Sequence, residues 1–228
     1  MACSALALAL AACGEGDKVE QATSTEVGSG TATETEEKPG GSLLETGFGQ
    51  SDTYVSLIAI VENTSDKVGQ TVTVQFNVKD ANDDLLVSES QVEHFSRVGQ
   101  NFPVQTQAEL PKGKKAAKVE VTLLIEDNGA FSPEPFPEIK TGRVTVVKSE
   151  YGDGFSAKVE VTNPQTEPLK SPKVDVVCYD TAKKIIGGSF TYPELIPPSG
   201  KAIAEVDLLV TGKPASCVAF ASPGPLED

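Results

Sequence analysis

Two segments that lie one hundred residues apart share a pattern of apolar residues, an aspartate and a polar turn. Residues 76–86 read FNVKDANDDLL, and residues 176–186 read VVCYDTAKKII. The matched blocks are 54–63 with 154–163, 71–80 with 171–180 and, after a one-residue deletion, 103–121 with 202–220. Three blocks in the same order indicate a duplicated unit, which constrains the chain to fold as two similar halves.

Within each copy, apolar and polar residues alternate. The apolar positions of the first copy are Val72, Val74, Phe76 and Val78, with polar residues between them. This period of two predicts a strand with one buried face. Polar turns over 80–84 and 180–184 would join it to the next strand. Short strands of this kind, without a helical period, predict an all-β fold of antiparallel sandwiches.

The duplication predicts two domains, residues 50–128 and residues 140–228. Residues 129–139 between them are proline-rich and are predicted to form a stiff, extended linker. In the last block the alignment pairs Gly113, Lys114, Val119 and Val121 with Gly212, Lys213, Val218 and Phe220. The two valines and their partners are therefore expected to face the cores.

The chain begins with a short apolar run, MACSALALALAAC, that ends at Cys13. Such a run with small residues is typical of a signal peptide (residues 1–12) and is too short to span a bilayer. The basic opening is absent, as in a signal truncated at its start. Leu-Ala-Ala-Cys resembles the lipobox of bacterial lipoproteins, which implies lipidation of Cys13 and a membrane-anchored, extracytoplasmic location at the cell surface. The alternative is an ordinary secretory peptide with an incidental cysteine.

Residues 13–49 follow as a segment rich in Gly, Ser, Thr and Glu. Such a composition buries too little apolar surface to offset the entropy of ordering the chain. We therefore predict a lipidated cysteine followed by a flexible acidic stalk, with a reach of roughly 30–36 Å. The alternative is a tail that binds a partner.

The strands before the two aspartates carry a family signature. Its residues are Phe76, Val78 and Asp80 in the first copy and Val176, Cys178, Tyr179 and Asp180 in the second, preceded by strands that end in Asn63 and Asn163. They resemble the FxLYD family, small immunoglobulin-like domains of prokaryotic surface lipoproteins. The resemblance implies two tandem immunoglobulin-like antiparallel β-sandwich domains in an extracytoplasmic setting, and it brings no catalytic site. With the composition of the preceding segment, the expected order is a disordered N-terminal stalk followed by these two domains.

Two cysteines remain in the second copy, Cys178 and Cys217. An exported location permits a disulfide between them. Strict alternation would place the two sulfur atoms on opposite faces of the sheet. Cys178 replaces the inward Val78, whereas Cys217 aligns with Lys118, which lies next to an inward position. A bulge would reconcile the two. A disulfide and two free buried thiols therefore both remain open.

The acidic turn of the first copy is the candidate metal site. Its oxygen-bearing residues are Asp80, Asn82, Asp83 and Asp84. They could bind Ca²⁺, but an EF-hand loop also needs Gly at its sixth position and Glu at its twelfth, where this chain has Leu85 and Gln91. A plain turn is the alternative. In the basic segment 111–118 a solvated turn and a contact for an acidic polymer or partner both remain open.

Composition excludes several function classes. The net charge of −14 repels phosphate backbones, so no nucleic-acid partner is expected. His94 is the one histidine of the chain, so the sequence offers almost no residues for a hydrolytic catalytic triad or a His-rich metal site. We expect no enzyme and no cofactor. The sequence predicts a non-enzymatic, lipid-anchored protein that presents two modules to an unknown envelope protein or polymer; the alternative is a solute- or Ca²⁺-binding envelope lipoprotein. The oligomeric state is not predicted.

Overall fold

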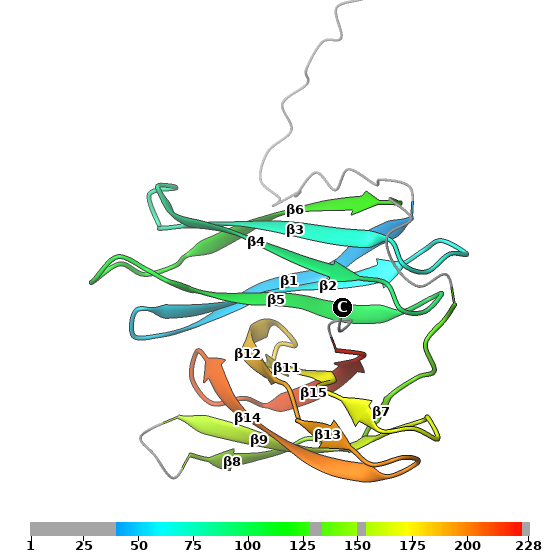
Figure 1. Ribbon diagram of the computed structural model, residues 1–228. Helices are drawn as coiled ribbons and strands as arrows, with labels where there is room; N and C mark the ends of the chain where they lie inside the picture. The colour runs from blue at the N-terminus through cyan, green and yellow to red at the C-terminus, as the bar shows by residue number, and fades with distance from the viewer. Residues whose placement is uncertain (1–39, 128–133, 150–153, 225–228) are drawn as a thin grey trace, which may run out of the picture. The chain divides into compact units, whose positions relative to one another are not determined.

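The computed structural model describes residues 40–127, 134–149 and 154–224, and every regular element in these ranges is a β-strand (Figure 1). The all-β prediction is confirmed. The predicted signal peptide, Cys13 and the stalk as far as residue 39 lie outside the described residues. No helix long and apolar enough to cross a membrane occurs in the described ranges.

The first copy forms two three-stranded antiparallel sheets around one core. Its strands are β1 (Gly41–Ser51), β2 (Tyr54–Asn63), β3 (Thr71–Lys79), β4 (Leu85–His94), β5 (Asn101–Glu109) and β6 (Lys118–Glu126). The sheet orders are β1-β2-β5 and β4-β3-β6. Alternate residues of β3 are buried, as predicted, and Phe76 is completely buried between the sheets. These two sheets are the first sandwich.

The second copy repeats this strand order. Its strands are β7 (Lys140–Thr141), β8 (Thr145–Lys148), β9 (Phe155–Thr162), β10 (Leu169–Lys170), β11 (Lys173–Tyr179), β12 (Ile185–Thr191), β13 (Leu195–Ile196), β14 (Lys201–Val210) and β15 (Ser216–Ser222). β9 lies between β14 and the pair β7 and β8, and β11 lies between β12 and β15. One pairing, at Gly187 and Gly188, also joins β12 to β14. These strands surround a separate core and are the second sandwich.

The aspartate turns are the same in both copies. Asp80 Oδ1 accepts the backbone N–H groups of Asn82 and Asp84, and Asp180 Oδ1 accepts those of Ala182 and Lys184. A residue with positive φ follows in each turn, Asp83 at 66° and Lys183 at 61°. Each aspartate therefore holds its own turn closed, the role that a short side-chain acceptor performs best.

The two strand-end asparagines are also equivalent. The Asn63 side-chain amide donates to the carbonyls of Lys67 and Arg97, and that of Asn163 donates to those of Glu167, Ile196 and Pro197. Both side chains are almost fully buried. Each amide ties the loop after its strand to the loop before β5 or β14, so the asparagine is a structural clamp in both copies.

The predicted alignment of the last block is wrong by one residue. Phe102 and Ala202 pair with Val61 and Val161, so β5 and β14 keep the offset of 100. Val119 and Cys217 face Val78 and Cys178, so β6 and β15 differ by 98. Both deletions therefore fall in the loop, because a one-residue slip within a strand would turn every side chain to the other face. Ala219, not Phe220, takes the inward place of Val121.

The stalk prediction is wrong for residues 41–49, which form most of β1. Leu43 and Phe48 of this strand pack against the first core. The register of β1 shifts between Leu43 and Glu45, which interrupts the alternation and lets two residues five positions apart face the same core. The predicted linker also ends earlier than residue 139, because Ile139 is buried in the second core and Phe136 packs against it.

Cys178 and Cys217 form a disulfide that joins β11 to β15. The register sets the two residues directly opposite each other, with a Cα–Cα distance of 4.1 Å. Strict alternation is compatible with this bond, because Cys217 takes the inward place of Val119 and not that of Lys118. No bulge lies between these two strands at this point.

Replacing both cysteines by alanine should lower the free energy of unfolding by about 4 kcal/mol, the loop-closure value for a cross-link across roughly 40 residues. Urea unfolding of the double variant Cys178→Ala/Cys217→Ala and of the unaltered protein under non-reducing conditions measures the difference. Equal midpoints and slopes would show that the disulfide contributes nothing.

Candidate functional site

The outer faces of two sheets bury each other between the sandwiches. Ile58 and Ile60 of β2 project away from the first core and pack against Val177 of β11 and Ile185 of β12. All four side chains are at most 8% exposed. We call them the interface cluster. They explain why β2 and β11 are buried on both faces, whereas β3 is buried on one.

Two glycines of β1 let its backbone approach β12 closely. A Cβ atom at Gly47 would lie 2.5 Å from that of Ile185, and one at Gly49 would collide with the Ile186 carbonyl oxygen. Next to this contact, the Gln50 backbone N–H donates to Thr211 Oγ1 at 2.8 Å. The sequence TGFGQ therefore serves the contact between the sandwiches.

A buried ionic group crosses the same boundary. Lys173 of β11 is 4% exposed. It forms an ion pair with Glu93 of the first sandwich and a second ion pair, at 3.3 Å, with Asp175 of its own strand. Gln105 of β5 donates to Asp175 Oδ1 at 2.6 Å and to the Ser189 carbonyl. The Lys173 ammonium also lies 5.0 Å from the centre of the Phe190 ring. One cation thus faces two carboxylates, and the first sandwich supplies Glu93 and Gln105.

Burial shifts the pKa values of this group. Desolvation raises the pKa of Asp175 to about 6, although the Lys173 charge and the Gln105 hydrogen bond act in the other direction. Desolvation also opposes the charge on Lys173, but Asp175 and Glu93 together raise the pKa of its ammonium above the ordinary value. Lys173 therefore stays charged, whereas Asp175 titrates near neutrality.

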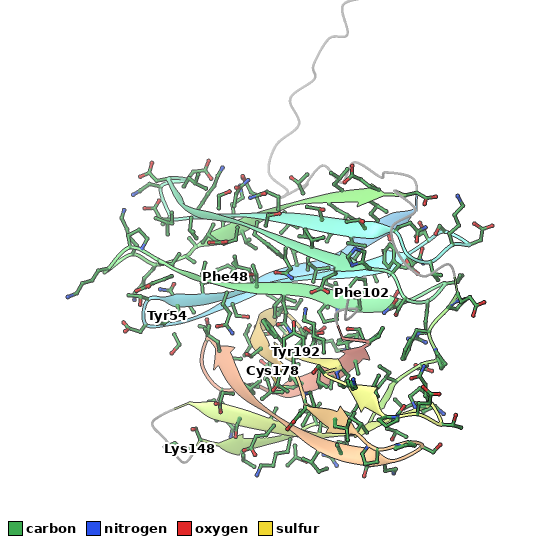
Figure 2. The ribbon with its side chains drawn as sticks, viewed as in Figure 1. Phe48, Tyr54, Phe102, Lys148, Cys178 and Tyr192 are labelled. Carbon is green, nitrogen blue, oxygen red and sulfur yellow. A yellow bond between two sulfur atoms is a disulfide. The ribbon has the colours of Figure 1, made fainter. Side chains whose placement is uncertain are left out.

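A cavity of about 190 Å³ adjoins this ionic group. We call it the interdomain pocket. The first sandwich contributes the end of β4 and Phe102; the second contributes Lys173, Tyr192 and the chain after β15. Figure 2 labels Phe102 and Tyr192, which line the pocket from the two sandwiches. Glu93, Phe95 and Phe136 also line the pocket.

His94 also lines the interdomain pocket. Desolvation lowers the pKa of its imidazole, more than the nearby Glu93 carboxylate raises it. The imidazole is therefore mostly neutral at neutral pH. The lone histidine of the sequence thus lies at this pocket, although nothing in its local sequence pointed there.

The candidate calcium-binding residues of the first copy form a turn. The carboxylate of Asp80 holds the turn through one oxygen and pairs with Lys114 through the other, at 3.2 Å. These hydrogen bonds, that of Asn82 first, lower the pKa of Asp80. Asp83 pairs with Lys79 and Lys118. In the described part of the chain no group of three or more His, Cys, Asp or Glu residues is placed to hold a metal ion.

The ionic group and the pocket were not predicted from the sequence. One signal was available: Ile58 and Ile60 make residues 57–61 a continuous apolar run, the mark of a strand buried on both faces. A second was Lys173 and Asp175 on a strand whose remaining residues are mostly apolar. Neither signal identifies the partner surface, which only the arrangement of the two sandwiches reveals.

Comparison with known proteins identifies no family. No protein-family model matches the chain, and no curated protein matches it. Among solved structures, the crystal structure of red sea bream transglutaminase is similar at 12% sequence identity with a TM-score of 0.26. The match covers 79% of this chain and 29% of that enzyme, so the chain spans less than a third of its length. At this TM-score the likeness carries no argument about fold or activity.

The raised pKa of Asp175 predicts a pH-dependent contribution to stability. Its folded pKa of about 6 lies above the ordinary value of 3.8, so the folded state binds the proton more tightly. This contribution is complete below about pH 4 and is lost as the pH rises through 6. Over that range the unaltered protein should lose about 3 kcal/mol of stability relative to Asp175→Asn.

Urea unfolding of both proteins at pH 4, 5, 6 and 7 measures this difference. The quantity of interest is how the difference in unfolding free energy between the two proteins changes with pH. The part of the difference that does not depend on pH, which is the cost of the substitution itself, then cancels. An identical substitution at the exposed Asp207 of β14 is the control and should leave the pH profile unchanged. A constant difference between the unaltered protein and Asp175→Asn would contradict the prediction.

Proposed function

We propose that the chain is a non-enzymatic, lipid-anchored extracytoplasmic protein of a bacterial surface. Its two immunoglobulin-like sandwiches act as one head that contacts an envelope protein or polymer. The lipobox-like sequence at Cys13 supports the anchor. The repeated Asp and Asn turns support two related modules of the kind that the FxLYD resemblance implies.

The observation that carries the contact role is the outer face of the sheet β4-β3-β6. Thr73, Gln75 and Asn77 of β3 line this face, opposite Val92, Ser90 and Ser88 of β4. Ser88 Oγ accepts from Gln75 and donates to Asn77, at 2.8 and 2.6 Å. Hydroxyl and amide groups adapt to many hydrogen-bonding partners. We call this surface the amide face.

The amide face differs from the rest of an acidic protein. Its centre is uncharged. Lys79, Lys118 and Glu120 form ion pairs at one end, and Glu126 lies opposite Thr71 at the other. An uncharged, hydrogen-bonding centre with a charged margin suits a polar partner such as a protein surface or a polysaccharide. The second sandwich packs on the opposite sheet of the first, so it leaves this face uncovered.

The calcium alternative gains no support from the acidic turn. Asp80 uses both of its oxygens within the protein, and the equivalent turn of the second copy has Lys183 and Lys184 in place of Asp83 and Asp84. Two of the four lysines in the basic segment are paired, Lys114 with Asp80 and Lys118 with Glu120. Contact through the amide face is therefore the better proposal.

Replacing Cys13 by serine should release the protein from the membrane, because serine has no thiol to receive the lipid. Detergent-phase partitioning of the full chain, expressed in a bacterium with its export signal, measures the change. The control is Cys3→Ser, which should remain in the detergent phase. Retention of Cys13→Ser in that phase would refute the lipid anchor.

A photo-crosslinking residue at position 75 should form adducts on living cells, since it lies at the centre of the amide face. The matched control replaces Lys158 on the outer face of β9, where it pairs with Glu205. Adducts should be several-fold more abundant from position 75. Equal yields from both positions would contradict the proposed contact surface.

A further inference from the structure

We propose that the interdomain pocket binds a small organic ammonium ion, with its charge at Glu93 and its apolar body against the aromatic rings. This goes beyond the proposed surface contact, because it concerns a different site and does not depend on the membrane anchor. The pocket lies between the two sandwiches, whereas the amide face lies on the first sandwich alone.

The volume of the pocket limits the size of its occupant. An apolar cavity of about 150 Å³ is large enough for benzene, and this pocket measures about 190 Å³. A single ring with a short charged substituent therefore fits. A sugar chain or a folded peptide does not.

The walls combine aromatic rings with charge. Phe95, Phe102, Phe136 and Tyr192 line the pocket. Phe95 and Phe102 meet edge to face, with ring centres 5.6 Å apart. Aromatic faces attract organic cations and also take up the apolar part of such a ligand.

The local charge selects a cation over an anion. Lys173 is the one ammonium among the residues that line the pocket, and it already faces Glu93 and Asp175. The three groups together carry a charge of −1 when both carboxylates are ionised. An anionic ligand would meet this net negative charge, whereas a cation would compensate it. In a partly dehydrated site such a charge difference has a larger effect than in water.

Glu93 provides a specific acceptor for that cation. Its Oε1 accepts from Lys173 and from Gln91, while Oε2 has no hydrogen-bond partner in the described part of the chain. The Glu93 side chain is 20% exposed and lines the pocket. The hydroxyl group of Tyr192, on the other sandwich, likewise makes no hydrogen bond with any described residue and can add a second polar contact.

Isothermal titration of the full chain with benzylammonium chloride tests the proposal. Benzyl alcohol and benzoate are the matched neutral and anionic probes of nearly the same size. Saturable binding of benzylammonium is expected, with an affinity at least about tenfold higher than that of either matched probe, the effect of one hydrogen bond to a charged group. Absence of saturable binding up to millimolar concentrations, or tighter binding of benzoate, would overturn the proposal.

Three variants locate the site. Glu93→Gln should weaken benzylammonium at least about tenfold and leave benzyl alcohol unchanged, because only the charge is removed. Tyr192→Ala should weaken both ligands by removing a wall. Glu89→Gln makes the same charge change on β4 outside the pocket and should leave the affinity unchanged.

Thermal melting of each variant establishes that it is folded. Tyr192 is 46% exposed, so its replacement keeps the proposal testable even where Glu93→Gln fails to fold. Equal affinity of benzylammonium for the unaltered protein and for folded Tyr192→Ala would refute this pocket as the site. An equal loss in Glu89→Gln and Glu93→Gln would show attraction by overall charge, which also refutes it.

Discussion

Burial of the outer faces of β2 and β11 against each other is the constraint on which the rest of the structure depends. The interface cluster supplies apolar burial, which is the main stabilising term in such contacts. The ionic group contributes less to stability, because burying three charges costs about as much as their attraction returns. Among the described residues, Gln105 Oε1 and Ser56 Oγ have no hydrogen-bond partner at this boundary. We infer that the apolar residues hold the sandwiches together and that the polar residues fix their register.

The duplication explains the strand order but not the contact. Both copies have the same sheets, yet they use different faces: the first copy uses the outer face of β1-β2-β5, and the second that of β12-β11-β15. A contact between unlike faces could in principle continue from copy to copy into an open fibre. The outer face of β9 and β14 disfavours such a contact, because Lys158 and Lys201 pair there with Glu205 and Glu160 where the first copy has Ile58 and Ile60.

Much of the fold could be predicted from the sequence, because local patterns determine it. The alternation in β3 and the Asp80 and Asp180 turns each follow from a few adjacent residues. The misplacement of Cys217 had a different origin. The second copy lacks one residue on each side of Gly212. An alignment with a single gap accounts for only one of these deletions and therefore shifts Cys217 by one position. The candidate site could not be predicted, because Glu93 and Lys173 lie eighty residues apart and meet only through the packing of separate sandwiches.

The position of the contacts also restricts how the pocket can work. Domains joined by a connector usually move relative to each other unless a large interface holds them. Here hydrogen bonds join the two sandwiches at both ends of the contact made by β2. Gln50 binds Thr211 near the start of β2, and Glu93 binds Lys173 near the end of β2. Opening a hinge at either end would expose the interface cluster and separate the buried ions. A ligand must therefore enter a pocket that already exists, and its affinity depends on how accurately the two sandwiches are aligned.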